Sequence, residues 1–308
     1  MLKITKWRIF MEYLLFFLKD LSFSFVIMTV GFILGWMIYN HIVLKDVCLK
    51  DALFEKDNVA AWIEFIGAFV FPVLFLAGEG IKGSASDNIY VDLAVCTGYT
   101  IFYIAILTLL RLSSKFIVSV INQKDSSGKI CLNKEIIEQG NVGAALFSVS
   151  LSVIFVIVIR YIDLIDIING NGFSALIKIL MFVAFMLIAL VAYTFILRIR
   201  TTLFKELFID NNAAAGVGLL GFVFAVQTIV DGAISIYQKD FEVLTVALVI
   251  AIALLIFGIL SVLFKLIFTK LIRVNIWKEI YEQNSTGAAL GQVALYIGIA
   301  NIIINFLK

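Results

Sequence analysis

The chain has 308 residues, of which 62% are hydrophobic and 15% are charged, and its net charge is +2. This balance excludes an ordinary soluble domain, in which about half of the residues are apolar. With only one histidine, His41, the chain also lacks the residues for a His-based catalytic triad or a multi-histidine metal site.

Long apolar runs recur along the whole sequence. A helix needs about 20 apolar residues to cross a bilayer, and the runs are too long and too continuous for the alternating strands of a β-barrel. The sequence therefore predicts an all-α transmembrane protein with eight helices. The predicted helices cover residues 21–44, 59–78, 89–110, 142–161, 172–197, 213–237, 241–264 and 286–306.

Basic residues lie mainly in the connections and helix ends that follow the first, third, fifth and seventh runs. The other three connections carry only Lys82, Arg160 and Lys239. The positive-inside rule therefore predicts that the four basic regions face the cytoplasm and that both termini lie outside.

The N-terminal tail does not fit this topology, because its four basic residues would prefer the cytoplasm. The stretch from this tail to the first connection is too short to cross the membrane twice. We therefore expect residues 1–20 to form an interfacial amphipathic segment that precedes the first span. The basic residues are Lys3, Lys6, Arg8 and Lys19.

A short motif recurs four times, each time where a basic connection enters an even-numbered helix. Each copy has an acid, then a polar residue, then small residues that open the helix. The polar residues are Asn58, Asn141, Asn212 and Ser285. Successive copies are separated by two membrane crossings, so the sequence predicts four parallel two-helix repeats about an axis along the membrane normal.

Two interpretations of the motif remain open. Asn and Ser are good N-cap residues, because their side chains accept hydrogen bonds from the free amide groups of the first helical turn. Alternatively, four helix N-termini gathered at the cytoplasmic face would form a polar, anion-attracting mouth.

The first and third copies of the motif match in loop length, as do the second and fourth. This alternation, with Asn-x-Ala-Ala-type helix starts in a four-helix unit, resembles the YjfL-like family of bacterial inner-membrane proteins, domain of unknown function 350. The fourth copy departs from the pattern, with Ser285 in place of Asn. The resemblance implies two four-helix units, at residues 21–165 and 166–308, and an inner-membrane location. It implies no catalytic residues.

Small residues follow one face of the even-numbered helices. In the helix at 286–306, steps of three and four residues, counted from the cap residue, reach Gly287, Gly291, Ala294 and Gly298 on one face. Because small residues let helices approach closely in lipid, we expect the even-numbered helices to form an inner ring and the odd-numbered helices to face lipid.

Six polar side chains interrupt the apolar even-numbered helices and are candidate functional residues. Glu64 lies on the small-residue face, about 9 Å from the cytoplasmic end of its helix at 1.5 Å per residue. A carboxylate at that depth is costly unless it is protonated, paired or hydrated. The set lines a narrow polar path or, alternatively, hydrogen-bonds across a packed interior. Its members are Glu64, Gln227, Asp231, Gln292, Asn301 and Asn305.

Two functions from different classes follow. The bundle is a channel or transporter for a small ion or solute, which we slightly favour because of Glu64 and Asn301. Alternatively, it is a non-catalytic scaffold that recruits partners or anionic lipid through basic cytoplasmic helix extensions at residues 111–122 and 265–281. We expect lipid, and either a second copy or a cytoplasmic protein, as partners; we expect no enzyme activity, nucleic acid, metal or cofactor.

Overall fold

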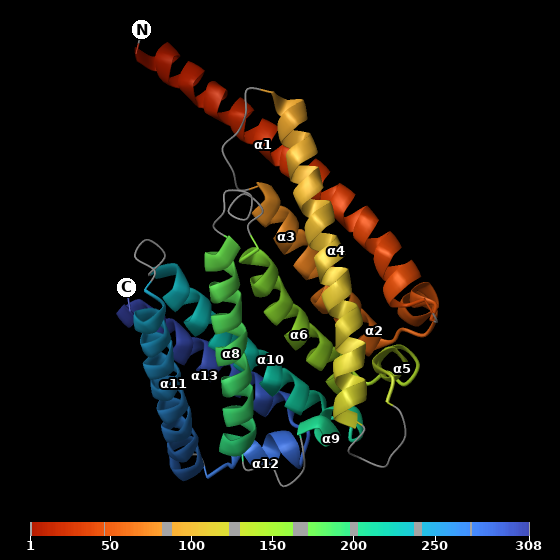
Figure 1. The fold of residues 1–308 in the computed structure, drawn as a ribbon, viewed down its shortest axis with the longest axis vertical. Coiled ribbons are helices and arrows are strands. Elements are labelled where there is room, and N and C mark those ends of the chain that lie inside the picture. Colours follow the sequence, from red (N-terminus) through yellow and green to blue (C-terminus); the bar gives the residue numbers. More distant parts are fainter. Residues whose placement is uncertain are drawn as a thin grey trace.

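The computed structural model describes residues 2–45, 47–81, 88–122, 130–162, 172–197, 203–236, 242–271 and 273–307. Within these ranges the chain is helical and has no strand (Figure 1). Eight helices are long and apolar enough to cross a membrane, which confirms the predicted all-α transmembrane class.

The odd-numbered spans are single long helices. The first belongs to α1 (Leu2–Ile38), which continues into the π-helical turn η1 (Tyr39–Val43). The others are α4 (Ile89–Asn122), α8 (Gly172–Leu197) and α11 (Val243–Leu271).

The even-numbered spans differ in regularity. The second is built from α2 (Val59–Ile63), the π-helical η3 (Glu64–Val70) and α3 (Phe71–Ile81), whereas the others are α6 (Val142–Arg160), α10 (Ala213–Ile236) and α13 (Thr286–Leu307). Short helices precede them in the chain. These are η2 (Asp51–Glu55), α5 (Leu132–Ile137), α9 (Leu203–Phe208) and α12 (Ile276–Tyr281).

Two sequence-based expectations about helix ends need revision. The predicted basic extension at 265–281 is not one helix, because α11 ends at Leu271, Arg273 adopts a left-handed backbone with φ +57°, and α12 starts at Ile276. The N-terminal segment runs without a break into the first span, since α1 is continuous from Leu2. Its interfacial location stays a prediction.

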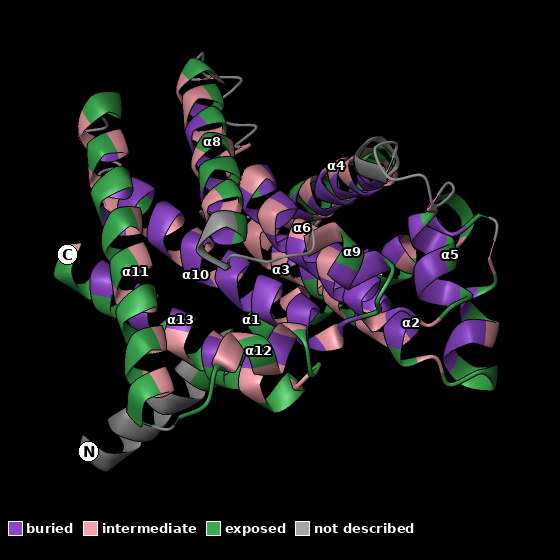
Figure 2. Cartoon of the chain, turned by 90° about the horizontal axis from the view of Figure 1, so that it is seen from below, coloured by how far each residue is buried: buried purple, intermediate pink, exposed green. Residues whose placement is uncertain are grey.

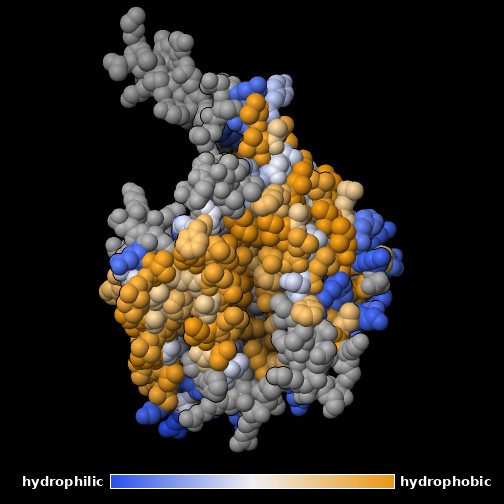
Figure 3. Space-filling model, in the orientation of Figure 1, coloured by the Kyte–Doolittle hydropathy of each residue, from blue (hydrophilic) through white to orange (hydrophobic). Residues whose placement is uncertain are grey.

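The even-numbered spans lie inside and the odd-numbered spans lie outside, as expected. The least buried even span, α13, is 39% buried, whereas the most buried odd span reaches only 33%. The four inner spans form a row: the second span packs on α6, α6 packs on α10, and α10 packs on α13. Buried residues accordingly concentrate on α6 and α10 (Figure 2). On the face seen in Figure 3, apolar side chains cover most of the surface, and hydrophilic ones lie at its edges, with the largest group on the right.

Small residues permit the close approach of neighbouring inner helices. A Cβ placed on Gly67 would lie 2.8 Å from a methyl group of Val149, and one on Gly221 would lie 2.3 Å from a methyl group of Val293. Both distances are too short for real carbon atoms, so larger side chains would force these helices apart.

The small-residue face of α13 is different from what the packing interpretation predicts. Gly287, Gly291, Ala294 and Gly298 are exposed, and no described atom lies within 4 Å of a Cβ placed on any of the three glycines. The expectation that this face packs inside the bundle is therefore wrong for the last helix.

The four motif copies form turns of one geometry, which we call the motif turns. In each, the backbone N–H of the cap residue donates to the carbonyl six residues earlier, and the residue before the cap has a positive φ. A left-handed residue at this position is typical of helix C-termini, as in the Schellman motif, but the hydrogen bond here spans one residue more than the Schellman bond. That position holds Asp57, Gly140, Asn211 and Asn284.

Each cap asparagine uses both ends of its amide. The Oδ1 atoms of Asn141 and Asn212 accept from the N–H groups of Ala144 and Ala215 at 2.9 Å, which caps their own helices. Their Nδ2 groups donate at 3.1 Å to Phe208 O and Ile280 O, which belong to the short helix of the following motif turn.

Asn58 makes the same two connections. Its Oδ1 accepts from the Ala61 N–H at 3.1 Å, and its Nδ2 donates to Ile136 O and Ile137 O at 3.0 and 2.9 Å. In these three motifs, one side chain therefore starts the inner helix and joins it to the next motif turn.

The left-handed residues complete two of these junctions. Asn211 Oδ1 accepts from the Val142 N–H at 2.9 Å, and Asn284 Oδ1 accepts from the Ala214 N–H at 3.0 Å. Each therefore caps the inner helix of the preceding motif.

Ser285 makes only one of the two connections that the cap asparagines make. Its Oγ caps α13 with one long bond, 3.4 Å from the Ala288 N–H, and serine has no amide that could donate to another turn.

We predict that Asn212→Asp destabilises the protein more than Ser285→Asp does. Aspartate is as good an N-cap as asparagine or serine. At position 212, however, a carboxylate oxygen would replace the amide that donates to Ile280 O, which leaves a buried acceptor unsatisfied at a cost of about 1–3 kcal/mol. Thermal unfolding in one detergent measures the difference. Equal losses at the two positions would show that the asparagines act as helix caps alone.

Candidate functional site

Glu64 lies at the centre of the strongest polar cluster in the described part of the chain. The side chain is fully buried, and its Oε1 atom accepts from the Tyr39 hydroxyl at 3.0 Å and from Arg111 Nε at 2.9 Å. Arg111 Nη2 also donates to the same oxygen. The cluster therefore ties together the first, second and third spans.

The charges of this cluster compensate each other. Arg111 is 3% exposed, and its Nη1 donates to Ser114 Oγ at 2.6 Å. The Tyr39 ring stacks on Phe69 with centroids 4.4 Å apart. Glu64 Oε2 has no hydrogen-bond partner among the described residues. Of the interpretations open for Glu64, the geometry is that of a paired carboxylate between helices.

Two π-helical stretches begin at residues of the cluster. Tyr39 opens η1, and Glu64 opens η3. Such stretches are rare and occur often at functional sites, because the extra residue per turn re-aims the side chains around it. The sequence carries no simple signal for either stretch.

Sequence reasoning missed Arg111, which it assigned to a basic cytoplasmic extension. The signal was present, because Arg111 is the one charged residue between Asp92 and Lys115 in an otherwise apolar span. A charge at that position requires a buried partner.

The second half of the chain has a neutral counterpart of the cluster. Tyr193 precedes Asn212 by the same 19 residues that separate Tyr39 from Asn58, and its ring stacks on Phe222 at 4.3 Å. At the place of Glu64, however, stands Gly218. No acid faces Tyr193 there among the described residues; its hydroxyl lies 3.0 Å from that of Tyr281. Burial raises the pKa of the Tyr281 phenol, which favours the neutral hydroxyl.

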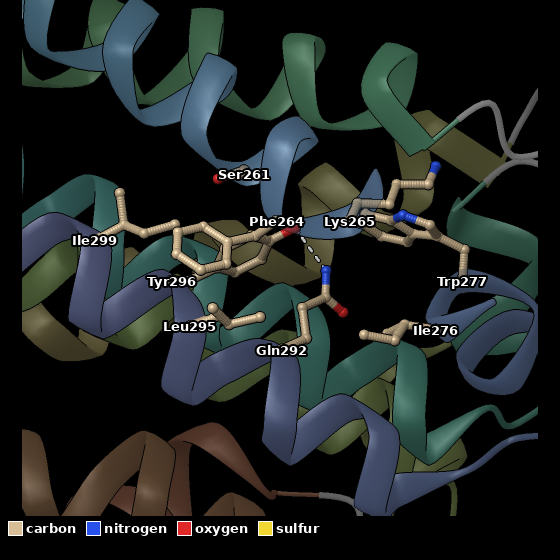
Figure 4. A pocket seen from close by; sticks show the side chains of 9 residues that line it. All are labelled: Ser261, Phe264, Lys265, Ile276, Trp277, Gln292, Leu295, Tyr296 and Ile299. Carbon is tan, nitrogen blue, oxygen red and sulfur yellow. Dashed lines mark hydrogen bonds between the residues drawn. The ribbon is translucent and has the colours of Figure 1, made fainter. Parts of the chain in front are cut away.

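A small cavity lies beside this counterpart, between α11, α12 and α13 (Figure 4). Gln292 Nε2 donates to the Tyr296 hydroxyl at 2.5 Å, and Lys265 Nζ lies 4.8 Å from the Trp277 ring centroid. Gln292 Oε1 and the Trp277 indole N–H have no described partner. The volume of about 20 Å³ is large enough for one water molecule.

The remaining predicted lining residues do not meet at one place. Asp231 accepts from Arg160 Nη1 at 3.0 Å and from the Tyr161 hydroxyl at 2.7 Å, at the end of α10 opposite its motif turn. Gln227 is half-buried in the same helix, and Asn301 and Asn305 lie exposed on α13. The structure therefore does not bring these residues together with Glu64.

A repeated Lys-Glu pair in the short helices was also missed. The carboxylates of Glu135 and Glu206 accept from the cap amides of Asn141 and Asn212 at 3.4 and 3.0 Å. Burial raises the pKa of the Glu135 carboxyl. The signal is in the sequence, since the pairs occupy the third and fourth positions of α5, α9 and α12. They are 134–135, 205–206 and 278–279.

Metal-ligating residues do not cluster in the described ranges, which contain no group of three or more His, Cys, Asp or Glu side chains able to hold an ion. Cys48, Cys96 and Cys131 are free thiols.

Comparison with known proteins places the chain in a family. Its sequence matches the family described as Domain of Unknown Function (DUF350) over residues 12–162 and again over residues 168–307. No curated protein and no solved structure is significantly similar to it. The two matches cover nearly the whole chain and meet at the connection between the fourth and fifth spans. The chain therefore belongs to the DUF350 family and carries two tandem copies of its domain.

Proposed function

We propose that this chain is a non-catalytic scaffold of the bacterial inner membrane, with its motif turns in the cytoplasm. The observation that carries the proposal is the Glu64–Arg111–Tyr39 cluster. Its two charged side chains bind each other and thereby join three helices. In a permeation pathway, such a carboxylate would face water or a mobile ion instead.

The packing of the inner helices supports the same function. Aromatic rings fill the space around the Glu64 cluster: Phe65 and Phe69 lie against Tyr39. The cavity beside Gln292 is large enough for only one water molecule. A continuous hydrated route would need polar groups at successive depths along one face, and the candidate residues are dispersed over several faces.

A row of exposed lysines supplies the surface that a scaffold needs. Lys134, Lys205 and Lys278 each occupy the third position of the short helix before a cap, so they recur from one motif turn to the next. In the proposed topology this row lies at the cytoplasmic surface. Anionic head groups attract each basic residue there by about 1 kcal/mol.

We expect Glu64→Gln to lower stability strongly and to leave ion flux absent. Removal of one partner of a buried ion pair leaves the other charge uncompensated and costs about 3–5 kcal/mol. Arg160→Gln is the matched control, because Arg160 is 36% exposed and such pairs contribute at most about 1 kcal/mol. Thermal unfolding and liposome flux at matched incorporation are the measurements. If the wild type conducts ions and a stably folded Glu64→Gln variant does not, the scaffold proposal is wrong and the protein has a permeation function.

The double variant Glu64→Gln, Arg111→Met isolates the cause of the loss. It removes both charges and keeps two side chains of similar size, so we expect it to unfold at a higher temperature than Glu64→Gln alone. A further loss of stability in the double variant would contradict the ion-pair interpretation.

We also predict that anionic lipid stabilises the wild type through the lysine row. Phosphatidylglycerol added to protein in neutral detergent should raise the unfolding temperature, and replacement of Lys134, Lys205 and Lys278 by Gln should reduce that increase. Replacement of Lys178, in the first turns of α8 at the opposite end of its span, is the control. An unchanged lipid effect in the triple variant would show that the row does not bind head groups.

A further inference from the structure

The exposed face of α13 bears residues that are poorly suited to lipid contact. Besides its small residues, Asn301 and Asn305 lie exposed on it, and no hydrogen bond connects either side chain to a described residue. Unpaired amides in hydrocarbon are costly, and glycine-lined helix faces in membranes usually contact another helix. This face therefore has the composition of an interface.

The contacts inside the chain indicate what such a face binds. In the junction inside each domain, the residue nine positions after one cap meets the residue eight positions after the next cap: Gly67 meets Val149, and Gly221 meets Val293. On α13 the ninth residue after the cap is Ala294, which is exposed.

The complementary half of the same contact is exposed at the other end of the row. The eighth residue after the first cap is Ile66, which is 50% exposed. Val59, in the first turn of the same span, is 60% exposed. The second span therefore presents bulky apolar side chains on the face with which α6 and α13 contact their preceding helices.

One complete junction between family domains already exists within the chain. The last inner helix of the first domain, α6, packs on the first inner helix of the second, α10. Gly216 of α10 approaches Leu146 of α6, where a Cβ would lie 2.9 Å from the leucine side chain. The corresponding free elements are α13, at the end of the second domain, and the second span, at the start of the first.

The hydrogen bonds at the motif-turn end of the junction can also form between two copies. Asn211 and Asn284, which precede their caps, accept from the first amides of the preceding inner helix. Asp57 occupies the same left-handed position in the first motif turn, and it is exposed. Its carboxylate is an acceptor that fits the first amides of an α13 helix.

We propose that α13 of one copy docks on the second span of another copy, so that chains assemble head to tail in the plane of the membrane. The contact repeats the junction found inside each domain, with Ala294 against Ile66, and Asp57 lies beside the N-terminus of α13. Such a heterologous contact generates a ring if its rotation closes and an open row if it does not.

Cysteine cross-linking tests the proposal directly. In full-length protein with Cys48, Cys96 and Cys131 replaced by Ser, an Ile66→Cys chain is mixed with an Ala294→Cys chain in lipid vesicles and oxidised. We expect a disulfide-linked dimer only when both chains are present. Gly67→Cys with Val149→Cys is the internal control, because their Cβ positions lie 3.7 Å apart.

Two outcomes would overturn the proposal. A dimer from Ala294→Cys chains alone would show that α13 pairs with α13 in a symmetric contact. An absent cross-link in the mixture, while the internal control forms its disulfide, would show that these faces do not meet.

A bulky residue on the open face separates assembly from folding. Gly291→Leu should reduce the assembly to single chains and leave the unfolding temperature of the chain within a few degrees of wild type, since no described atom lies near that position. Gly258→Leu on α11 is the matched control, because its surroundings are equally open, and this variant should assemble normally.

Native mass spectrometry measures the oligomeric state of each variant. Wild type that is monomeric in lipid, or a Gly291→Leu variant that assembles like wild type, would contradict head-to-tail docking. Neither result depends on the flux or lipid-binding measurements.

Discussion

The architecture depends on the hydrogen-bonding needs of helix ends. The first amides of every inner helix have no carbonyl partner in their own helix, and an unmade bond at the edge of a bilayer is costly. Asn58, Asn141 and Asn212 meet this need with Oδ1, and their Nδ2 groups bind the next motif turn. The interaction that starts each helix is therefore also the one that sets its neighbour beside it.

The small residues and the buried ion pair act within this frame. Once the motif turns fix the helix starts, Gly67 and Gly221 let the inner helices approach closely, and the longer odd-numbered helices cover the row against lipid. The Glu64–Arg111 pair then joins the covering helices to the row in the first half of the chain. The second half uses the neutral Tyr193–Tyr281 contact in its place, so the two domains share a backbone plan and differ in interior chemistry.

Much of this fold could be predicted because it follows from local patterns. Apolar runs predict the spans, and small residues at helical spacing predict which spans lie inside. The arrangement around Glu64 could not be predicted, because two π-helical stretches shift the register of Tyr39 and Glu64, and because Arg111 lies far from Glu64 in sequence. The exposure of the α13 face was also missed, because the same small-residue pattern occurs on helices whose face is covered and on α13, whose face is open.

The account requires all four motif turns to lie on one side of the membrane, because each cap amide must reach the next turn. Accessibility of cysteines introduced singly at the exposed residues Glu55, Glu138, Asp210 and Glu282 tests this most directly, with an impermeant thiol reagent in a cysteine-free background. The account predicts that all four react in inside-out vesicles and that none reacts in right-side-out vesicles. A single turn labelled from the opposite side would break the series of junctions and contradict the arrangement of the inner helices.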